Sequence, residues 1–171
     1  MKKYLSSFVV GFGAGVLQVV PVAKSFACCI IIPLAAYFAL MLDQKANKNI
    51  NVIMPVSRAL IIGLLTGIYA ALFGSFFDIL ITFITKNNDI IAVFPEFQKM
   101  ITNFPISEGL QKEVLNLYSS VIDQIKDVGF SALYTLSILF NNLIINLIFG
   151  LIGGVVGVQI INSRIKKSNE L

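Results

Sequence analysis

The stretch NNLIINLIFGLIGGVVG, residues 141–157, is apolar enough to lie inside a lipid bilayer, yet it contains three asparagines and four glycines. Lipid tails solvate leucine as well as another helix does, so helices in a membrane associate through close backbone contact and interhelical hydrogen bonds. Steps of three and four residues return to the same face of a helix. The stripe with these steps consists of Asn142, Asn146, Gly150, Gly153 or Gly154, and Gly157. We expect this stripe to face protein, while Ile148 and Ile152 meet lipid.

The composition of the chain indicates a membrane protein. Of the 171 residues, 57% are hydrophobic and 13% are charged, and the mean hydropathy is +0.85, outside the range of ordinary soluble domains. No linker rich in Gly, Ser or Pro divides the sequence, so we expect a single membrane domain over residues 1–171. The net charge of +4 does not indicate nucleic-acid binding, because the basic residues form short clusters beside apolar runs.

Four apolar stretches approach or exceed the roughly 20 residues that a helix needs to cross a bilayer. They cover residues of about 4–22, 25–42, 59–85 and 130–162. Because no water in the bilayer core satisfies backbone groups, each stretch should be helical. The expected fold class is therefore an all-α integral membrane protein with four transmembrane helices. The short link between the first two stretches predicts an antiparallel hairpin, and Pro33 predicts a bend in the second.

The first stretch has a second interpretation, as a cleaved leader. It begins with MKK and continues into an apolar run, and SFAC at residues 25–28 is a poor match to a lipoprotein cleavage box. Lys24 interrupts the region where cleavage would occur, and the apolar part is long for a leader. We therefore favour a retained first span.

The distribution of Lys and Arg predicts the orientation in a bacterial inner membrane. With both termini in the cytoplasm, the cytoplasmic side carries Lys2, Lys3, Lys45, Lys48, Arg58, Arg164, Lys166 and Lys167. The other side carries Lys24 and four lysines of one long loop. Lys and Arg are enriched on the cytoplasmic side of membrane proteins, and those in long loops have less influence on the orientation. That loop also has six acidic residues, so it is net acidic. We expect a multi-pass protein with both termini cytoplasmic.

The long loop between the third and fourth stretches contains an extracytoplasmic amphipathic segment, at residues of about 90–128. In its second half apolar residues recur at steps of three and four, with charged residues between them. Ser107 is a suitable N-cap for this helix and Gly129 a suitable end. Residues 94–104 are expected to form a shorter helix. Such helices lie on the membrane surface, cover the bundle, or offer a docking face to a partner.

Small residues recur along one face of the other spans as well. Glycine lets two helix backbones approach closely, so aligned stripes on several helices predict a closely packed bundle. The glycines expected to serve helix packing are Gly11, Gly15, Gly63, Gly67, Gly74, Gly150, Gly153, Gly154 and Gly157.

One group of polar side chains is a candidate site. A rise of about 1.5 Å per residue places the polar residues of the spans in the outer half of the bilayer, and an ionisable group inside a span is by default a functional hypothesis. Asp78, Asn142, Asn146 and Gln18 are expected to form an outward-facing pocket for a cation or a lipid headgroup. The alternative is structural: Asp78 is protonated or solvated at the interface, and the asparagines only hold helices together.

The sequence offers no constellation of residues for catalysis. It has no histidine, the commonest metal ligand and acid–base group, and no Walker loop or nucleophile–base pair. Cys28 and Cys29 are adjacent, and adjacent cysteines form strained disulfides and chelate poorly without further soft ligands. Acylation, oxidation and metal binding are therefore less favoured for them than simple packing. We expect no catalytic residue, no bound metal and no cofactor.

Two stretches together resemble a known type of protein. They are GFGAGVLQVVPVAKSFACCIIIPLAAYFAL at residues 11–40 and RALIIGLLTGIYAALFGSFFDI at residues 58–79, followed by a long outer segment and a Gly-rich last span. In this order they resemble small four-span bacterial inner-membrane proteins grouped under a domain of unknown function, common in Bacteroidetes-like lineages. The resemblance covers most of the chain, and it implies the architecture and the inner-membrane location only.

Two functions from different classes follow. The first is a non-enzymatic accessory or scaffold protein, whose Gly and Asn stripes pack the bundle or dock a larger membrane complex. Its partners would be membrane lipids and either further copies of the chain or other membrane proteins, with no nucleic acid. The second is a small transporter or channel with a path through Asp78, Asn142 and Asn146.

Overall fold

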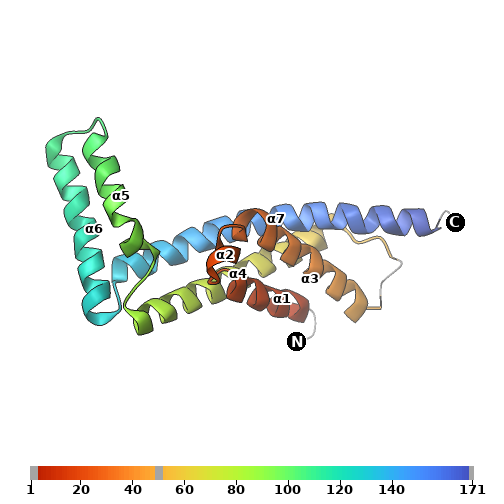
Figure 1. The fold of residues 1–171 in the computed structure, drawn as a ribbon. Coiled ribbons are helices and arrows are strands. Elements are labelled where there is room, and N and C mark those ends of the chain that lie inside the picture. The colour runs from red at the N-terminus through yellow and green to blue at the C-terminus, as the bar shows by residue number, and fades with distance from the viewer. Residues whose placement is uncertain (1–3, 49–51, 170–171) are drawn as a thin grey trace. The chain divides into compact units, whose positions relative to one another are not determined.

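The computed structural model describes residues 4–48 and 52–169, and all secondary structure in these ranges is helical (Figure 1). Helix accounts for 87% of the structure. The elements in chain order are α1 (Leu5–Leu17), α2 (Pro21–Lys24), a π-helical turn (Ala27–Ile31), α3 (Ile32–Ala46), α4 (Val56–Thr85), α5 (Asp89–Asn103), α6 (Glu108–Val128) and α7 (Ala132–Asn169).

The chain divides into two compact units. The first unit is Met1–Phe77 with Leu139–Leu171, and the second unit is Asp78–Ile138. Helices α4 and α7 contribute residues to both, whereas the whole of α5 and α6 belongs to the second. Compactness does not decide how a chain crosses a membrane, so the single membrane domain expected from the sequence stays a prediction.

Within the described residues, three helices are long and apolar enough to cross a membrane: Ala27–Ala46, Val56–Thr85 and Ala132–Ser168. They coincide with the second, third and fourth stretches expected from the sequence. The structure thus supports a membrane protein with three helices of spanning length, whereas four spans were expected.

The first expected span, residues 4–22, is interrupted before it reaches spanning length. Helix α1 has 13 residues, which is about 20 Å of helix against about 30 Å of hydrocarbon. Val20 is extended (φ −77°, ψ 122°) and Pro21 starts the next helix. A residue before proline is pushed out of the helical region, so the hydropathy of this stretch overestimates the length of its helix.

The second span begins with a wide turn. The N–H of Ile31 bonds to the carbonyl of Phe26, five residues earlier, over 3.2 Å. Pro33 lies in the first turn of α3 and has no N–H for the carbonyl four residues before it. The irregularity that the sequence analysis expected at Pro33 therefore lies in the turn just before it.

Helix α1 runs parallel to α4 in the first unit. The Ser7 hydroxyl donates to the carbonyl of Ile62 over 3.3 Å. Further along both helices, the Gln18 amide donates to the carbonyl of Ala70 over 3.2 Å. Between these bonds Gly11 faces α4, where a Cβ would come within 3.3 Å of the Ala70 nitrogen.

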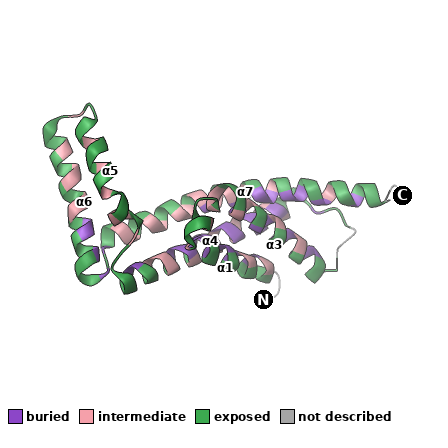
Figure 2. Cartoon of the chain, viewed as in Figure 1, coloured by how far each residue is buried: buried purple, intermediate pink, exposed green. Residues whose placement is uncertain are grey.

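Helix α7 runs antiparallel to α4. A Cβ on Gly67 would meet the backbone of Asn146, whereas a Cβ on Gly154, later in α7, would meet the carbonyl of Ala59, earlier in α4. Each helix therefore presents glycine where the other presents backbone. Figure 2 shows buried residues gathered along α3, α4 and α7 in this region.

Helix α3 packs parallel to α7 and also contacts α1. Gly153 lies against Pro33, and Gly157 lies against Tyr37, so the contacts advance in the same direction along α3 and α7. Since α1 follows α4 and α3 follows α7, α1 and α3 are antiparallel where they pack together, as expected of the first hairpin. The buried apolar residues of this core include Ala39, Leu40, Ile62 and Val158.

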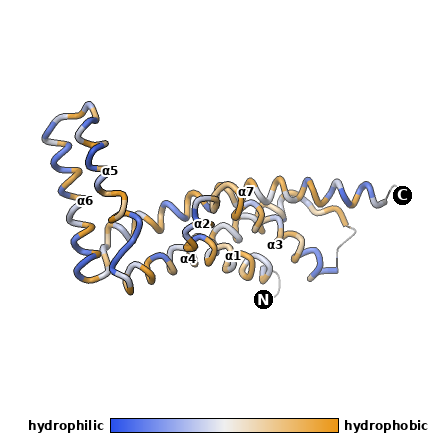
Figure 3. The backbone as a smooth tube through the Cα atoms, viewed as in Figure 1, coloured by the Kyte–Doolittle hydropathy of each residue, from blue (hydrophilic) through white to orange (hydrophobic). Residues whose placement is uncertain are grey.

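The second unit contains the helical hairpin of α5 and α6. The side chain of Asn88 caps α5 by accepting from the N–H of Ile91 over 3.3 Å. Ser107 caps α6 in the same way, and Gly129 ends it with φ 77°, so both boundaries expected for α6 are confirmed. Figure 3 shows hydrophobic and hydrophilic residues alternating along both helices of the hairpin, which agrees with their expected amphipathic character.

Replacing Gly67 with Ala is expected to destabilise the protein by about 1–3 kcal/mol, because the added methyl group overlaps the Asn146 backbone. Gly13→Ala is the matched control, since no atom lies within 4 Å of a Cβ at that position. Both changes raise helix propensity alike, so their difference reports packing. Unfolding in detergent, followed by circular dichroism, measures it. Equal stability of the two variants would contradict the close packing of α4 and α7.

Candidate functional site

A hydrogen-bonded pair of amides joins three helices inside the first unit. Asn146 on α7 donates from Nδ2 to Oε1 of Gln18, which follows α1, over 3.0 Å. The Gln18 Nε2 donates in turn to the carbonyl of Ala70 on α4 over 3.2 Å. Asn146 is 2% exposed and Gln18 8% exposed, so the pair is withdrawn from solvent and lipid alike. The arrangement satisfies two side chains that would otherwise be costly in an apolar interior.

Glycines make room for this pair. Gly67 lies against the Asn146 backbone, and a Cβ on Gly74 would come within 3.2 Å of the Gln18 amide. Any larger side chain at either position would push the amides apart. Two of the expected polar residues therefore meet because two of the expected packing residues are small.

Asn142 makes a separate bond one turn earlier on α7. Its Nδ2 donates to the hydroxyl oxygen of Ser75 over 2.9 Å, and Ser75 is 1% exposed. This bond joins α7 to α4, as does the contact of Gly67 with Asn146. Ser75 was not among the residues expected at the site, although it directly follows Gly74 in the chain.

Asp78 belongs to the second unit. Its Oδ2 accepts a hydrogen bond from the hydroxyl of Tyr134 over 3.3 Å, and both side chains are partly buried. The structure thus brings Gln18 and Asn146 together, places Asn142 beside Ser75, and pairs Asp78 with Tyr134. The single pocket expected from all four residues stays a prediction.

Eight of the nine glycines expected to serve packing lie against another helix, and the ninth, Gly74, lies against the side chain of Gln18 at the end of α1. For each of them a Cβ would come within 3.2 Å of such an atom. Gly13 and Gly109, which were not in that set, have no atom within 4 Å of the same position. On the other side of α7, Ile148 and Ile152 are about half exposed, as the aliphatic face was expected to be.

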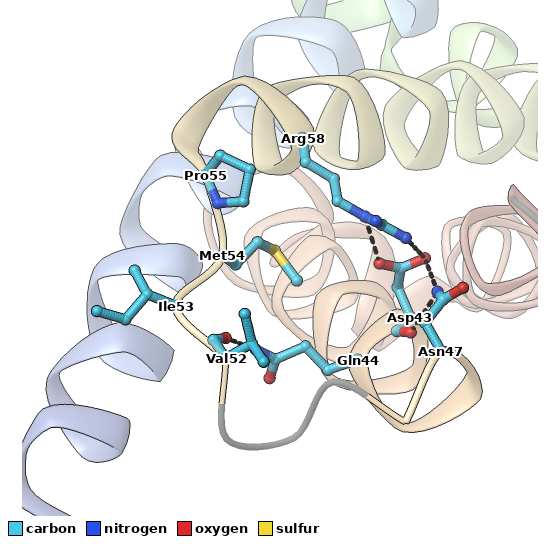
Figure 4. Close-up of a pocket in the computed structure, with 8 residues that line it drawn as sticks. All are labelled: Asp43, Gln44, Asn47, Val52, Ile53, Met54, Pro55 and Arg58. Atoms are coloured by element: carbon cyan, nitrogen blue, oxygen red, sulfur yellow. Dashed lines mark hydrogen bonds and ion pairs between the residues drawn. The ribbon is translucent and has the colours of Figure 1, made fainter. Parts of the chain in front are cut away.

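A partly buried ion pair joins α3 to α4, and it was not expected from the sequence (Figure 4). Asp43 is 3% exposed, and its two oxygens accept from Nε and Nη2 of Arg58 over 2.9 and 3.1 Å. Asn47 donates a third bond to Oδ1 of Asp43 over 3.0 Å. A planar guanidinium matches a carboxylate in this two-pronged geometry. One signal was present in the sequence: Asp43 is the only acidic residue in residues 1–77.

Polar side chains also hold the segment that leads into α4. Asn162 on α7 accepts from the N–H of Met54 and donates to its carbonyl, both over 2.9 Å. Gln44 donates to the carbonyl of Val52 over 3.4 Å. The hollow lined by Asp43, Gln44, Val52 and Met54, among others, has a volume of about 60 Å³, far below that of sites for small organic ligands. The cluster is suited to fix a connection between helices.

Cys28 and Cys29 lie in the π-helical turn, with their Sγ atoms 3.4 Å apart. Cys29 is exposed and Cys28 partly buried. Over residues 4–48 and 52–169, no three His, Cys, Asp or Glu side chains lie close enough to hold a metal ion.

Comparison with protein families, with curated proteins and with solved structures finds no match to this chain. The resemblance to four-span proteins of a domain of unknown function stays a prediction.

The bond between Gln18 and Asn146 is expected to contribute about 1 kcal/mol of coupling. A double-mutant cycle of Gln18→Leu and Asn146→Leu, measured by unfolding in detergent, gives this value. Gln18→Leu combined with Asn142→Leu is the control cycle, because Asn142 bonds to Ser75. Coupling of the same size in both cycles would show that the amide pair is not specific.

Arg58→Met should destabilise the protein by about 2–3 kcal/mol, because it leaves the Asp43 carboxylate buried without its cation. Adding Asp43→Leu should restore most of this stability, since both charges are then absent. Lys45→Met, which removes an exposed charge from the end of α3, serves as the control and should change little. If the double variant were no more stable than Arg58→Met, the ion pair would not explain the loss.

Proposed function

We propose that this protein is a non-enzymatic scaffold or accessory subunit of the bacterial inner membrane, crossing it several times with both termini in the cytoplasm. Three helices of spanning length support the membrane location. The ends of α3 and α7 and the start of α4 lie together, joined by Asp43 with Arg58 and by Asn162 with Met54. Lys45, Lys48, Arg164, Lys166 and Lys167 cluster in sequence at these helix ends, which favours a cytoplasmic position for them.

The observation that carries the proposal is the tight closure of the first unit. Gly63 and Gly150 oppose each other so closely that a Cβ on either would meet the carbonyl of the other. The nearby Asn146 is buried with its amide bonded to Gln18. Helices packed backbone to backbone leave little room for a hydrated path. This favours a static packing role over movement of a solute between α4 and α7.

The exposed surfaces suit association with other membrane components. The outer side of α7 has large aliphatic residues along its length, as expected for contact with lipid or with another membrane protein. The α5–α6 hairpin also exposes apolar side chains, among them Met100, Phe104 and Leu117. Such surfaces favour further copies of the chain or a larger membrane complex as partners.

A small transporter or channel is the second candidate. The hydrogen bond between Tyr134 and Asp78 favours it, because an ionisable group within an apolar helix is a common feature of ion paths. The amides of Asn142 and Asn146, which such a path would also use, already bond to Ser75 and Gln18. We therefore place transport second.

Purification from native membranes in mild detergent tests the proposal. A scaffold should elute as an oligomer or with stoichiometric membrane proteins, and chemical cross-linking in intact membranes should give the same products. Proteoliposomes that contain the purified protein should release entrapped ions no faster than protein-free liposomes. A lone monomer in both preparations would contradict the scaffold role, and ion release abolished by Asp78→Asn would favour the channel.

A further inference from the structure

A groove lies within the second unit, between the α5–α6 hairpin and the start of α7. We name it the hairpin groove. Its volume is about 290 Å³, at the lower end of the range for small-molecule sites. The residues that define its walls are Ile90, Phe97, Val114, Tyr118, Leu133 and Tyr134. Almost all of this surface is apolar, so the groove suits a narrow apolar body such as a single hydrocarbon chain.

Aromatic rings form one wall of the hairpin groove. Phe97 and Tyr118 stack with ring centroids 4.1 Å apart and planes at 21°. Phe94 stacks on Tyr118 as well, at 5.9 Å and 8°. Stacked rings from two helices fix this wall in place. The negative faces of such rings also attract ammonium groups.

A carboxylate lies beside the groove. The ring of Tyr134 lines the groove, and its hydroxyl donates to Oδ2 of Asp78 over 3.3 Å. Ser137, one turn after Tyr134 on α7, adds a hydroxyl group to the lining. The groove therefore combines a long apolar wall with an acidic group near Tyr134, which is the pattern of a site for an amphiphile.

A buried hydroxyl group close to Tyr134 has no partner among the described residues. Ser131, three residues before Tyr134, is 1% exposed, and its hydroxyl has no hydrogen-bond partner within residues 4–48 and 52–169. A buried hydroxyl without a bond is costly, so this group favours a ligand that carries polar hydrogens, or ordered water, in this region.

The charge of the second unit selects the sign of the ligand. Residues 78–138 contain seven acidic side chains, four lysines and no arginine. The unit is therefore net negative, although the whole chain has a net charge of +4. Such a field attracts cations and repels sulfate, phosphate and carboxylate groups.

We propose that the hairpin groove binds an amphiphile with one apolar chain and an ammonium headgroup. The chain lies between the hairpin and α7, against Phe97 and Tyr118. The ammonium lies beside the Asp78 carboxylate and the Tyr134 ring.

Surfactants with one tail and different headgroups test this site. The full chain is purified in dodecyl maltoside, a neutral surfactant, and titrated with dodecylammonium or dodecyl sulfate while tyrosine fluorescence is recorded. We expect saturable binding of the ammonium probe, at least about tenfold tighter than that of the sulfate probe. Equal affinity of the two probes, or no saturable signal with the ammonium probe, would overturn the proposal.

Matched variants locate the binding. Asp78→Asn should weaken binding of the ammonium probe about tenfold, whereas Asp123→Asn, which removes an exposed acid of α6, should change it little. Val114→Trp fills the groove and should abolish binding, whereas Leu110→Trp, at an exposed position outside the groove, should not. Circular dichroism verifies folding. If Asp78→Asn does not fold, the proposal is tested by the comparison of Val114→Trp with Leu110→Trp and by the comparison of the ammonium probe with the sulfate probe. Equal effects within either pair of variants would refute the assignment.

Discussion

The contact of α4 with α7 through their backbones is the constraint on which the first unit depends. Gly63, Gly67, Gly150 and Gly154 allow it, because each lies where a Cβ would overlap the other helix. Close approach of this kind gives van der Waals contact and interhelical bonds that lipid cannot replace. It also brings Asn146 within reach of Gln18 and Asn142 within reach of Ser75. The polar bonds are therefore a consequence of the small residues, and neither would form at an ordinary helix separation.

The spacing of small residues was the most informative feature of the sequence. It separated Gly11 and Gly15, which face α4, from Gly13, where no atom lies within 4 Å of a Cβ, because steps of three and four residues mark one face of a helix. The boundaries of α6 were also readable, since Ser107 and Gly129 provide standard ends. These features are local, and local chemistry decides them.

Other features depend on tertiary structure or on backbone detail and were not readable. Hydropathy averaged over residues 4–22 does not reveal that the helix is interrupted at Val20 and Pro21. The pairing of Asp43 with Arg58 depends on the turn between α3 and α4, which sets the two side chains opposite each other. The hydrogen bond that Asp78 accepts from Tyr134 depends on how α4 and α7 are rotated about their axes, which residue spacing alone does not give.

The bond from Asn146 to Gln18 spans 128 positions of the chain, and this separation has a consequence for biosynthesis. At about 5–20 residues per second, ribosomes need roughly 6 to 26 seconds to make the intervening polypeptide. During this interval Gln18 has been synthesised without its final partner. The carbonyl of Ala14, 3.5 Å from the Gln18 Nε2, offers an acceptor from within its own segment. Assembly of the first unit thus ends with α7, whose Asn146 gives the Gln18 Oε1 its donor and ties the earliest helix to the last.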